Sequence, residues 1–113
     1  MQKFEHYTLT LAGTSTMKTL ADVIPAGQEI PNVYAVWVQA ATGNSNPIYI
    51  GGLNATVTTT NYAVYIPAPA ATIPAAPFSL GDVFPYGALD LRAIRVIGTN
   101  NEKLQIGIVP IPS

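Results

Sequence analysis

The sequence predicts an all-β protein, namely a single antiparallel β-sandwich, jelly-roll-like, with about eight short strands. Turn-forming glycine, proline and asparagine residues recur roughly every 8–12 positions, and many of the segments between them are rich in β-branched and aromatic residues. Hardly any stretch places apolar residues at the spacing of a helix. A length of 113 residues fits one domain. We therefore expect one β-sandwich domain over residues 1–113, with minimal helix.

The N-terminal region, residues 1–16, is expected to form a strand or an arm. Between Lys3 and Leu11 the apolar residues alternate with polar ones, which predicts a first strand. One face of that strand carries Tyr7, Leu9 and Leu11. Gly13–Thr16 is expected to form the turn that follows it.

Two short segments lead to the centre of the chain. Met17–Ile24 fits either an amphipathic turn of helix or a second strand, and its β-rich surroundings favour the strand. Pro25–Gln28 places proline and glycine where a tight turn requires them. This second segment is therefore expected to be a loop.

The central stretch consists of two apolar runs, Tyr34–Ala41 and Ile48–Ile50, on either side of residues 42–47. The intervening glycine, asparagines and proline favour a reversal of the backbone, so the stretch predicts an antiparallel hairpin at the centre of the core. Both faces of the first run are largely apolar, which is typical of a strand that is covered on both sides. Trp37 is accordingly expected to be a core residue.

A second hairpin is predicted from Ala55–Thr60 and Tyr62–Ile66, with its turn near Thr60-Asn61. Residues 67–77 follow and hold four prolines and five alanines. Proline lacks an amide donor and fixes φ, so this segment is expected to cross the outside of the sheets in an extended form. Packing there is favoured over the alternative, a proline-rich ligand for an aromatic groove on a partner. Apolar side chains just beyond it are expected to cap one end of the fold: Phe78, Leu80, Val83, Phe84 and Tyr86.

The C-terminal part predicts a third hairpin, formed by Ile94–Gly98 and Lys103–Val109 around a turn at Thr99–Glu102. The apolar positions change parity just before the first of these strands. We attribute this change to a bulge or a short turn at Arg92-Ala93.

Charged residues are scarce, and this excludes several function classes. Lys, Arg, Asp and Glu make up 10% of the chain, against roughly 25% in ordinary soluble domains. A net charge of −1 offers no basic field for nucleic acid or an anionic membrane. The start of the chain lacks the features of a signal peptide, and no apolar run is long enough to span a bilayer, so we expect a soluble protein made in the cytosol. Hydroxyl and methyl groups are cheap to desolvate, so much of the surface is expected to meet other subunits.

No chemistry of catalysis or metal binding is indicated. His6 is the only histidine, there is no cysteine, and the six acidic residues are scattered singly. The sequence therefore predicts a protein that is not an enzyme and has no cofactor or metal. The alternative fold, an open barrel of the oligonucleotide-binding type, would need a basic and aromatic strand face, and only five Lys and Arg residues exist.

Several segments together carry a resemblance to a known group of proteins. They are the Pro25–Gly27 turn, the run Asn46–Gly52, the proline-rich crossing, Leu89–Leu91 and Ile94–Asn100 with its closing strand. In this order they resemble small virion proteins of tailed bacteriophages, over residues 25 to 110 approximately. The resemblance implies a compact β-sandwich or jelly roll that decorates heads, cements capsomers or forms the head of a fibre, commonly as a trimer.

The resemblance leads to the expected function of a virion protein that decorates or cements the capsid by bridging major capsid subunits as a homotrimer. The alternative is a fibre-head or carbohydrate-binding module in which aromatic residues stack on sugars. The residues concerned are Tyr34, Trp37, Tyr49, Tyr62 and Tyr65. The favoured interpretation is that these aromatic residues have a structural role in the core of the strands. The two chain ends lie outside the best-matched region and are expected to contact the partner. The candidate contact residues are Phe4, His6, Tyr7, Pro110, Ile111 and Pro112.

Overall fold

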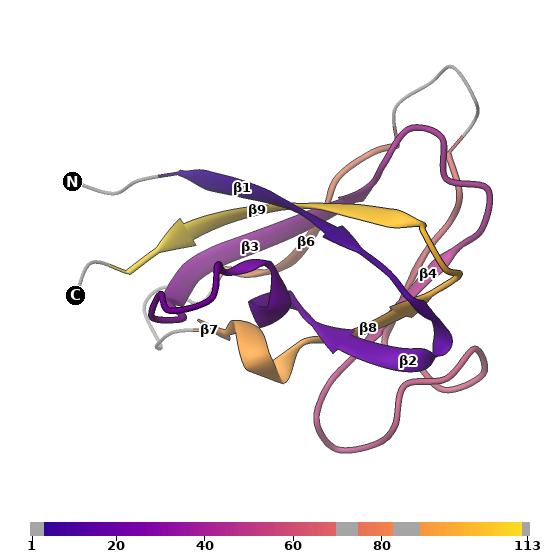
Figure 1. Cartoon of the computed structure of the whole chain (residues 1–113), viewed down its shortest axis with the longest axis horizontal. Helices are drawn as coiled ribbons and strands as arrows, with labels where there is room; N and C mark the ends of the chain where they lie inside the picture. Colours follow the sequence, from indigo (N-terminus) through magenta and orange to yellow (C-terminus); the bar gives the residue numbers. More distant parts are fainter. Residues whose placement is uncertain (1–3, 70–74, 83–88, 112–113) are drawn as a thin grey trace.

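The computed structural model, which describes residues 4–69, 75–82 and 89–111, is a β-sandwich of two antiparallel sheets (Figure 1). Two short 3₁₀ turns, η1 (Leu20–Val23) and η2 (Leu91–Ala93), are the helical elements of the described residues. Nine strands are found in these residues: β1 (Glu5–Thr10), β2 (Gly13–Thr19), β3 (Asn32–Ala40), β4 (Ile48–Gly51), β5 (Val64–Ile66), β6 (Phe78–Asp82), β7 (Leu89–Asp90), β8 (Arg95–Gly98) and β9 (Lys103–Pro110).

The order of the strands is that of a jelly roll. One sheet, here called sheet A, has the order β1-β9-β3-β6, with the two-residue β7 also paired to β3; the other, sheet B, has the order β2-β8-β4-β5. The first two strands therefore pair with the last two, and successive strands from β1 to β4 alternate between the sheets. This arrangement confirms the predicted antiparallel β-sandwich, since β7 is the only described strand beyond the eight of a simple jelly roll.

Two of the predicted hairpins are wrong for the same reason. β3 and β4 lie in different sheets, and so do β8 and β9, so the turns between them carry the chain across the sandwich instead of back along one sheet. A strand with one apolar face looks the same in a sequence whether its neighbour pairs beside it or packs against it. The pattern alone could not distinguish these two connections.

The two crossing connections are fastened to each other by buried polar side chains. Asn44 donates to the carbonyl of Lys103 at 2.7 Å and accepts from its N–H at 3.0 Å. The carboxylate of Glu102 accepts from the Ser45 N–H at 3.1 and 3.2 Å and from Nδ2 of Asn46 at 3.2 Å. Asn44 and Glu102 are each only 8% exposed, so these partners replace the water that burial removes.

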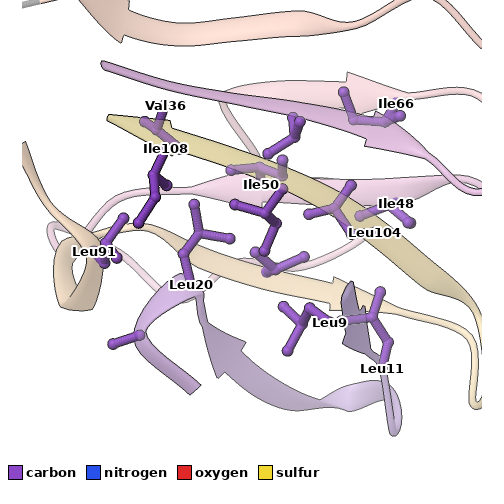
Figure 2. Packing of buried hydrophobic residues seen from close by; sticks show 14 of the residues in the cluster. Leu9, Leu11, Leu20, Val36, Ile48, Ile50, Ile66, Leu91, Leu104 and Ile108 are labelled. Atoms are coloured by element: carbon purple, nitrogen blue, oxygen red, sulfur yellow. The ribbon is translucent and has the colours of Figure 1, made fainter. Parts of the chain in front are cut away.

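The core lies between the sheets and is built from leucine, isoleucine and valine (Figure 2). The predicted alternation is confirmed in β1 and β9, where inward-facing side chains are buried; these are Leu9 in β1 and Leu104, Ile106 and Ile108 in β9, with Leu11 just beyond β1. Leu20 of η1 and Leu91 of η2 close the same core. The predicted parity change before β8 is confirmed, because η2 forms a short turn there.

Other local predictions need correction. Gly13–Thr16 is not a turn but the first part of β2, which pairs with β8 from Gly13 onward with a shift in register. The segment Met17–Ile24, predicted to be a strand, is one only as far as Thr19, and η1 begins at Leu20. Ala55–Thr60 contains no strand. The chain turns at Thr58–Asn61, where two backbone hydrogen bonds join these residues, and β5 pairs with β4 instead of with Ala55–Thr60.

The proline-rich crossing is described at its two ends, residues 67–69 and 75–77, neither of which lies in a strand. Residues 78–82, predicted to begin a cap, form β6 and pair with β3 in sheet A. The remaining predicted cap residues, Val83, Phe84 and Tyr86, lie outside the described residues.

Candidate binding surfaces

Trp37 is not a core residue, contrary to the prediction. Its neighbours Val36 and Val38 are fully buried in the core, whereas Trp37 is half-buried and contacts residues of the outer face of sheet A. Its cross-strand partner in β9 is Gly107. Because Gly107 has no side chain, the indole lies against the backbone of β9. The apolar character of both strand faces therefore has two causes, a core on one side and an exposed aromatic surface on the other.

Phe4 and Trp37 form the centre of this outer surface, here called the Phe4–Trp37 surface. Their rings are stacked, with centroids 5.2 Å apart and planes at 6°, and Phe4 is 62% exposed. His6 lies next to Phe4, with ring centroids 6.4 Å apart. A shallow hollow of about 160 Å³ runs between these rings and residues of β3 and β9.

Three polar side chains on the outer face of sheet A, beside the Phe4 and Trp37 rings, have partners within the chain. The Thr8 hydroxyl donates to Oε1 of Gln105 at 2.7 Å, and Nε2 of Gln39 donates to the carbonyl of Ala75. Such groups lose little when a partner excludes water, because their hydrogen bonds persist. The surface is therefore suited to an apolar contact with another protein.

A second aromatic group lies on the outer face of sheet B and is here called the tyrosine cluster: Tyr49, Tyr62 and Tyr65. Tyr49 and Tyr65 are cross-strand partners in β4 and β5, and the three ring centroids are 5.1, 5.5 and 6.0 Å apart. Tyr62 and Tyr65 are 44% and 48% exposed. The expectation that these aromatics fill the core is therefore wrong for Tyr62 and Tyr65. In β4 and β5 the inward positions are taken by Ile48, Ile50 and Ile66.

A hollow of about 150 Å³ adjoins the tyrosine cluster. It lies between the end of β4 and the loop that leads to β5. Its lining consists of Gly51, Gly52, Asn54, Ala55, Thr56, Val57, Asn61, Tyr62 and Ala63.

The predicted contact residues at the N-terminal end are divided between the two sides of sheet A. Phe4 and His6 are exposed on the outer face, whereas Tyr7 is half-buried and packs against the core. The Tyr7 hydroxyl donates to Oε1 of Glu5 at 2.7 Å. This hydrogen bond, assisted by burial and by the negative charge of Glu5, raises the pKa of Tyr7 above its ordinary value of 10.0.

The predicted contact residues at the C-terminal end are tied into the fold where the structure describes them. Pro110 is the last residue of β9 and pairs with Val33, and the N–H of Ile111 donates to the carbonyl of Asn32 at 2.9 Å. The expectation that a proline here leaves the end free of the sheet is wrong for these two residues. Pro112 lies outside the described residues.

Comparisons with protein-family models, with curated proteins and with solved structures found no match to this chain. Within the described residues, no group of three or more histidine and acidic side chains is placed to hold a metal ion. No helix in that part of the chain is long and apolar enough to cross a membrane.

Proposed function

We propose that this chain is a non-enzymatic structural protein of a phage virion, which decorates or cements the capsid by binding major capsid subunits as a homo-oligomer. The observation that supports this most directly is the Phe4–Trp37 surface. It is exposed and aromatic, Gln39 and Gln105 beside it each make a hydrogen bond within the chain, and it includes two of the residues expected from the sequence to contact a partner, Phe4 and His6.

The energetics of such a contact suit a protein that coats a shell. Exposed aromatic side chains supply large apolar area at low cost in conformational entropy, and aromatic residues are enriched where binding energy concentrates. Each copy buries a modest surface. A homo-oligomer that binds several capsid subunits at once stays bound more strongly, because its remaining contacts keep a released copy at a high effective concentration near its site.

Binding to empty, expanded capsids of the parent phage tests this proposal. We expect Phe4→Ala to weaken binding and the matched variant Phe78→Ala to leave it unchanged, because Phe78 is also exposed but pairs in register with the inward-facing Val38. Equal binding by wild type and Phe4→Ala would contradict the assignment of the contact.

The position in the virion separates this function from the alternative of a fibre head. Antibody against the chain, applied to intact particles and viewed by electron microscopy, is expected to label the whole head. Label confined to tail or fibre tips would contradict the decorating role and support the receptor-binding one.

A further inference from the structure

We propose that the tyrosine cluster and its adjoining hollow form a binding site for a neutral saccharide. The site is separate from the proposed capsid contact. It lies on the outer face of sheet B, whereas the Phe4–Trp37 surface lies on the outer face of sheet A. A copy seated on a capsid by sheet A would therefore present the tyrosine cluster away from the shell.

The cluster supplies the platform that a sugar ring requires. A pyranose has a face of C–H groups that packs on an aromatic ring, and hydroxyl groups around its edge that need hydrogen-bond partners. Tyrosine offers both an apolar ring and a polar hydroxyl. Tyr62 and Tyr65 are about half exposed. Tyr62 lines the hollow, and the ring of Tyr65 lies beside it with the two centroids 6.0 Å apart.

The hollow supplies the polar partners and the room. Asn54, Thr56 and Asn61 bring two side-chain amides and a hydroxyl to its wall. Gly52 has no side chain, and a β-carbon there would meet only Oδ1 of Asn54 at 3.6 Å, so a ligand can approach its backbone closely. A volume of about 150 Å³ suits one small unit, since it is well below the roughly 300–1,000 Å³ of sites for drug-sized ligands.

The loop that forms the hollow is held in place before any ligand arrives. Val57 is 4% exposed and packs so closely on Gly51 that a β-carbon there would overlap its side chain. Thr58 and Asn61 exchange two backbone hydrogen bonds of 2.9 and 3.3 Å, and Nδ2 of Asn61 donates to the carbonyl of Thr56 at 3.3 Å. A preformed site loses less entropy when it binds.

The charge of the site selects the class of ligand. Among the described residues that line the hollow, none is a lysine, arginine, aspartate or glutamate. A phosphate, nucleotide or acidic sugar would find no counter-charge, whereas a neutral sugar would need none. The Phe4–Trp37 surface is less suitable, because its indole already packs on Phe4 and on Gly107, and Gln39 and Gln105 each already make a hydrogen bond within the chain.

The test is a nuclear magnetic resonance titration of the isotope-labelled full chain. The probes are the methyl glycosides of glucose, galactose, mannose and N-acetylglucosamine, with the methyl glycoside of glucuronic acid as a charged comparison. We expect at least one neutral probe to shift the amide signals of Gly51, Gly52 and Asn61, with a dissociation constant in the millimolar range that is typical of a single small unit.

Variants with matched chemistry then locate the contact. Tyr65→Ala is expected to weaken binding about tenfold, a ratio that corresponds to roughly 1.4 kcal/mol. Tyr65→Phe keeps the ring and should retain most of the affinity, and Phe4→Ala should have no effect. Amide spectra of each variant establish that the fold is retained before affinities are compared.

Each other result overturns the proposal. These results are the absence of shifts with every neutral probe, shifts confined to the Phe4–Trp37 surface, and a preference for the glucuronide. Binding at the cluster by a peptide with the sequence of residues 67–77, with no response to any sugar, would replace the saccharide by a proline-rich partner. The capsid-binding assay is independent, because it reports on sheet A.

Discussion

The indole of Trp37 lies directly over the backbone of Gly107, its partner in the register of β3 and β9. A β-carbon at position 107 would overlap the Cε2, Cζ2 and Nε1 atoms of the ring. The missing side chain therefore creates the space in which the indole lies flat, and Phe4 stacks against that ring. The Phe4–Trp37 surface depends on this one glycine in a central strand.

Gly107→Ala is accordingly expected to destabilise the protein by about 1–3 kcal/mol, the usual cost of overpacking. Urea unfolding of the wild type and the variant measures this change. Gly52→Ala is the matched control, because an added β-carbon there meets only Oδ1 of Asn54, at 3.6 Å. If both substitutions had the same effect, the loss would belong to glycine replacement in general and not to the indole contact.

The position of Trp37 also predicts its fluorescence. A half-buried indole beneath Phe4 should emit at an intermediate wavelength and be partly accessible to iodide. Phe4→Ala should shift the emission to the red and increase quenching, because the exposed ring of Phe4 covers the indole. Emission that is fully protected from iodide in both proteins would restore the original prediction that Trp37 is a core residue.

The polar contacts between the two crossing connections predict a second site of instability. Glu102→Ala removes the buried acceptor of the Ser45 N–H and of the Asn46 amide, and it leaves both donors without this partner. We expect a loss of roughly 1.5–3 kcal/mol, the range for hydrogen bonds to a charged group. Glu29→Ala is the control, since Glu29 is exposed. Equal midpoints in urea for the two variants would show that the hydrogen bonds of Glu102 contribute nothing to the free energy of unfolding.

The strands on either side of these contacts show which part of the fold the sequence could predict. The alternation of Leu104, Ile106 and Ile108 correctly predicted β9 and its inward face, because a period of two needs only local information. The pairing of β1 with β9 depends on residues about a hundred positions apart, for example Glu5 and Ile108, and no local pattern contains it. The turn between β8 and β9 was predicted, but its crossing between sheets was not.

The binding surfaces were harder to predict for a related reason. Trp37 and Tyr65 stand in apolar strands, and composition alone assigns such aromatics to a core. Two signals pointed elsewhere: a glycine facing Trp37 in the neighbouring strand, and the isoleucines beside Tyr49 and Tyr65, which already fill the inward positions. The first signal cannot be read without the register, and the second requires knowing which face of each strand is turned to the core.

Tyr7 predicts a change at alkaline pH. Its pKa is raised mainly by the hydrogen bond that its hydroxyl donates to Glu5, so the folded state favours the protonated phenol. The stabilisation is complete below the ordinary pKa of 10.0 and is lost as the pH rises through the higher folded value. In an ultraviolet titration, the difference between the wild-type curve and the Tyr7→Phe curve should show one tyrosine that ionises above pH 10.0. A difference curve with its midpoint at or below the ordinary pKa of 10.0 would contradict this assignment.

Asp90 predicts a smaller change at acid pH. The side-chain hydrogen bond from Arg92, with a second bond from its backbone N–H, lowers the pKa of Asp90 below its ordinary value of 3.8. The stabilisation is present above that ordinary value and is lost as the pH falls through the lower folded one. The Asp90 side chain is 43% exposed, so solvent weakens the pair, and Asp90→Asn should differ little from wild type at neutral pH in its urea midpoint. A large loss at neutral pH would contradict this.

The last prediction concerns assembly: the isolated protein is expected to be a homotrimer that responds little to salt. Only 10% of its residues are charged, whereas ordinary soluble domains keep their surfaces hydrated with far more. Met17 and Leu53 are exposed in the single copy and belong to neither of the proposed binding surfaces, and closed symmetry is the common way to cover such area. An interface of this kind contains few ion pairs for salt to screen. Light scattering coupled to gel filtration, at low salt and at about 1 M salt, measures the mass. A monomer at micromolar concentration would contradict the argument from composition. A dimer would contradict only the three-fold stoichiometry. Dissociation at high salt would show that the few charged residues, with Arg92 and Arg95 among them, hold the subunits together.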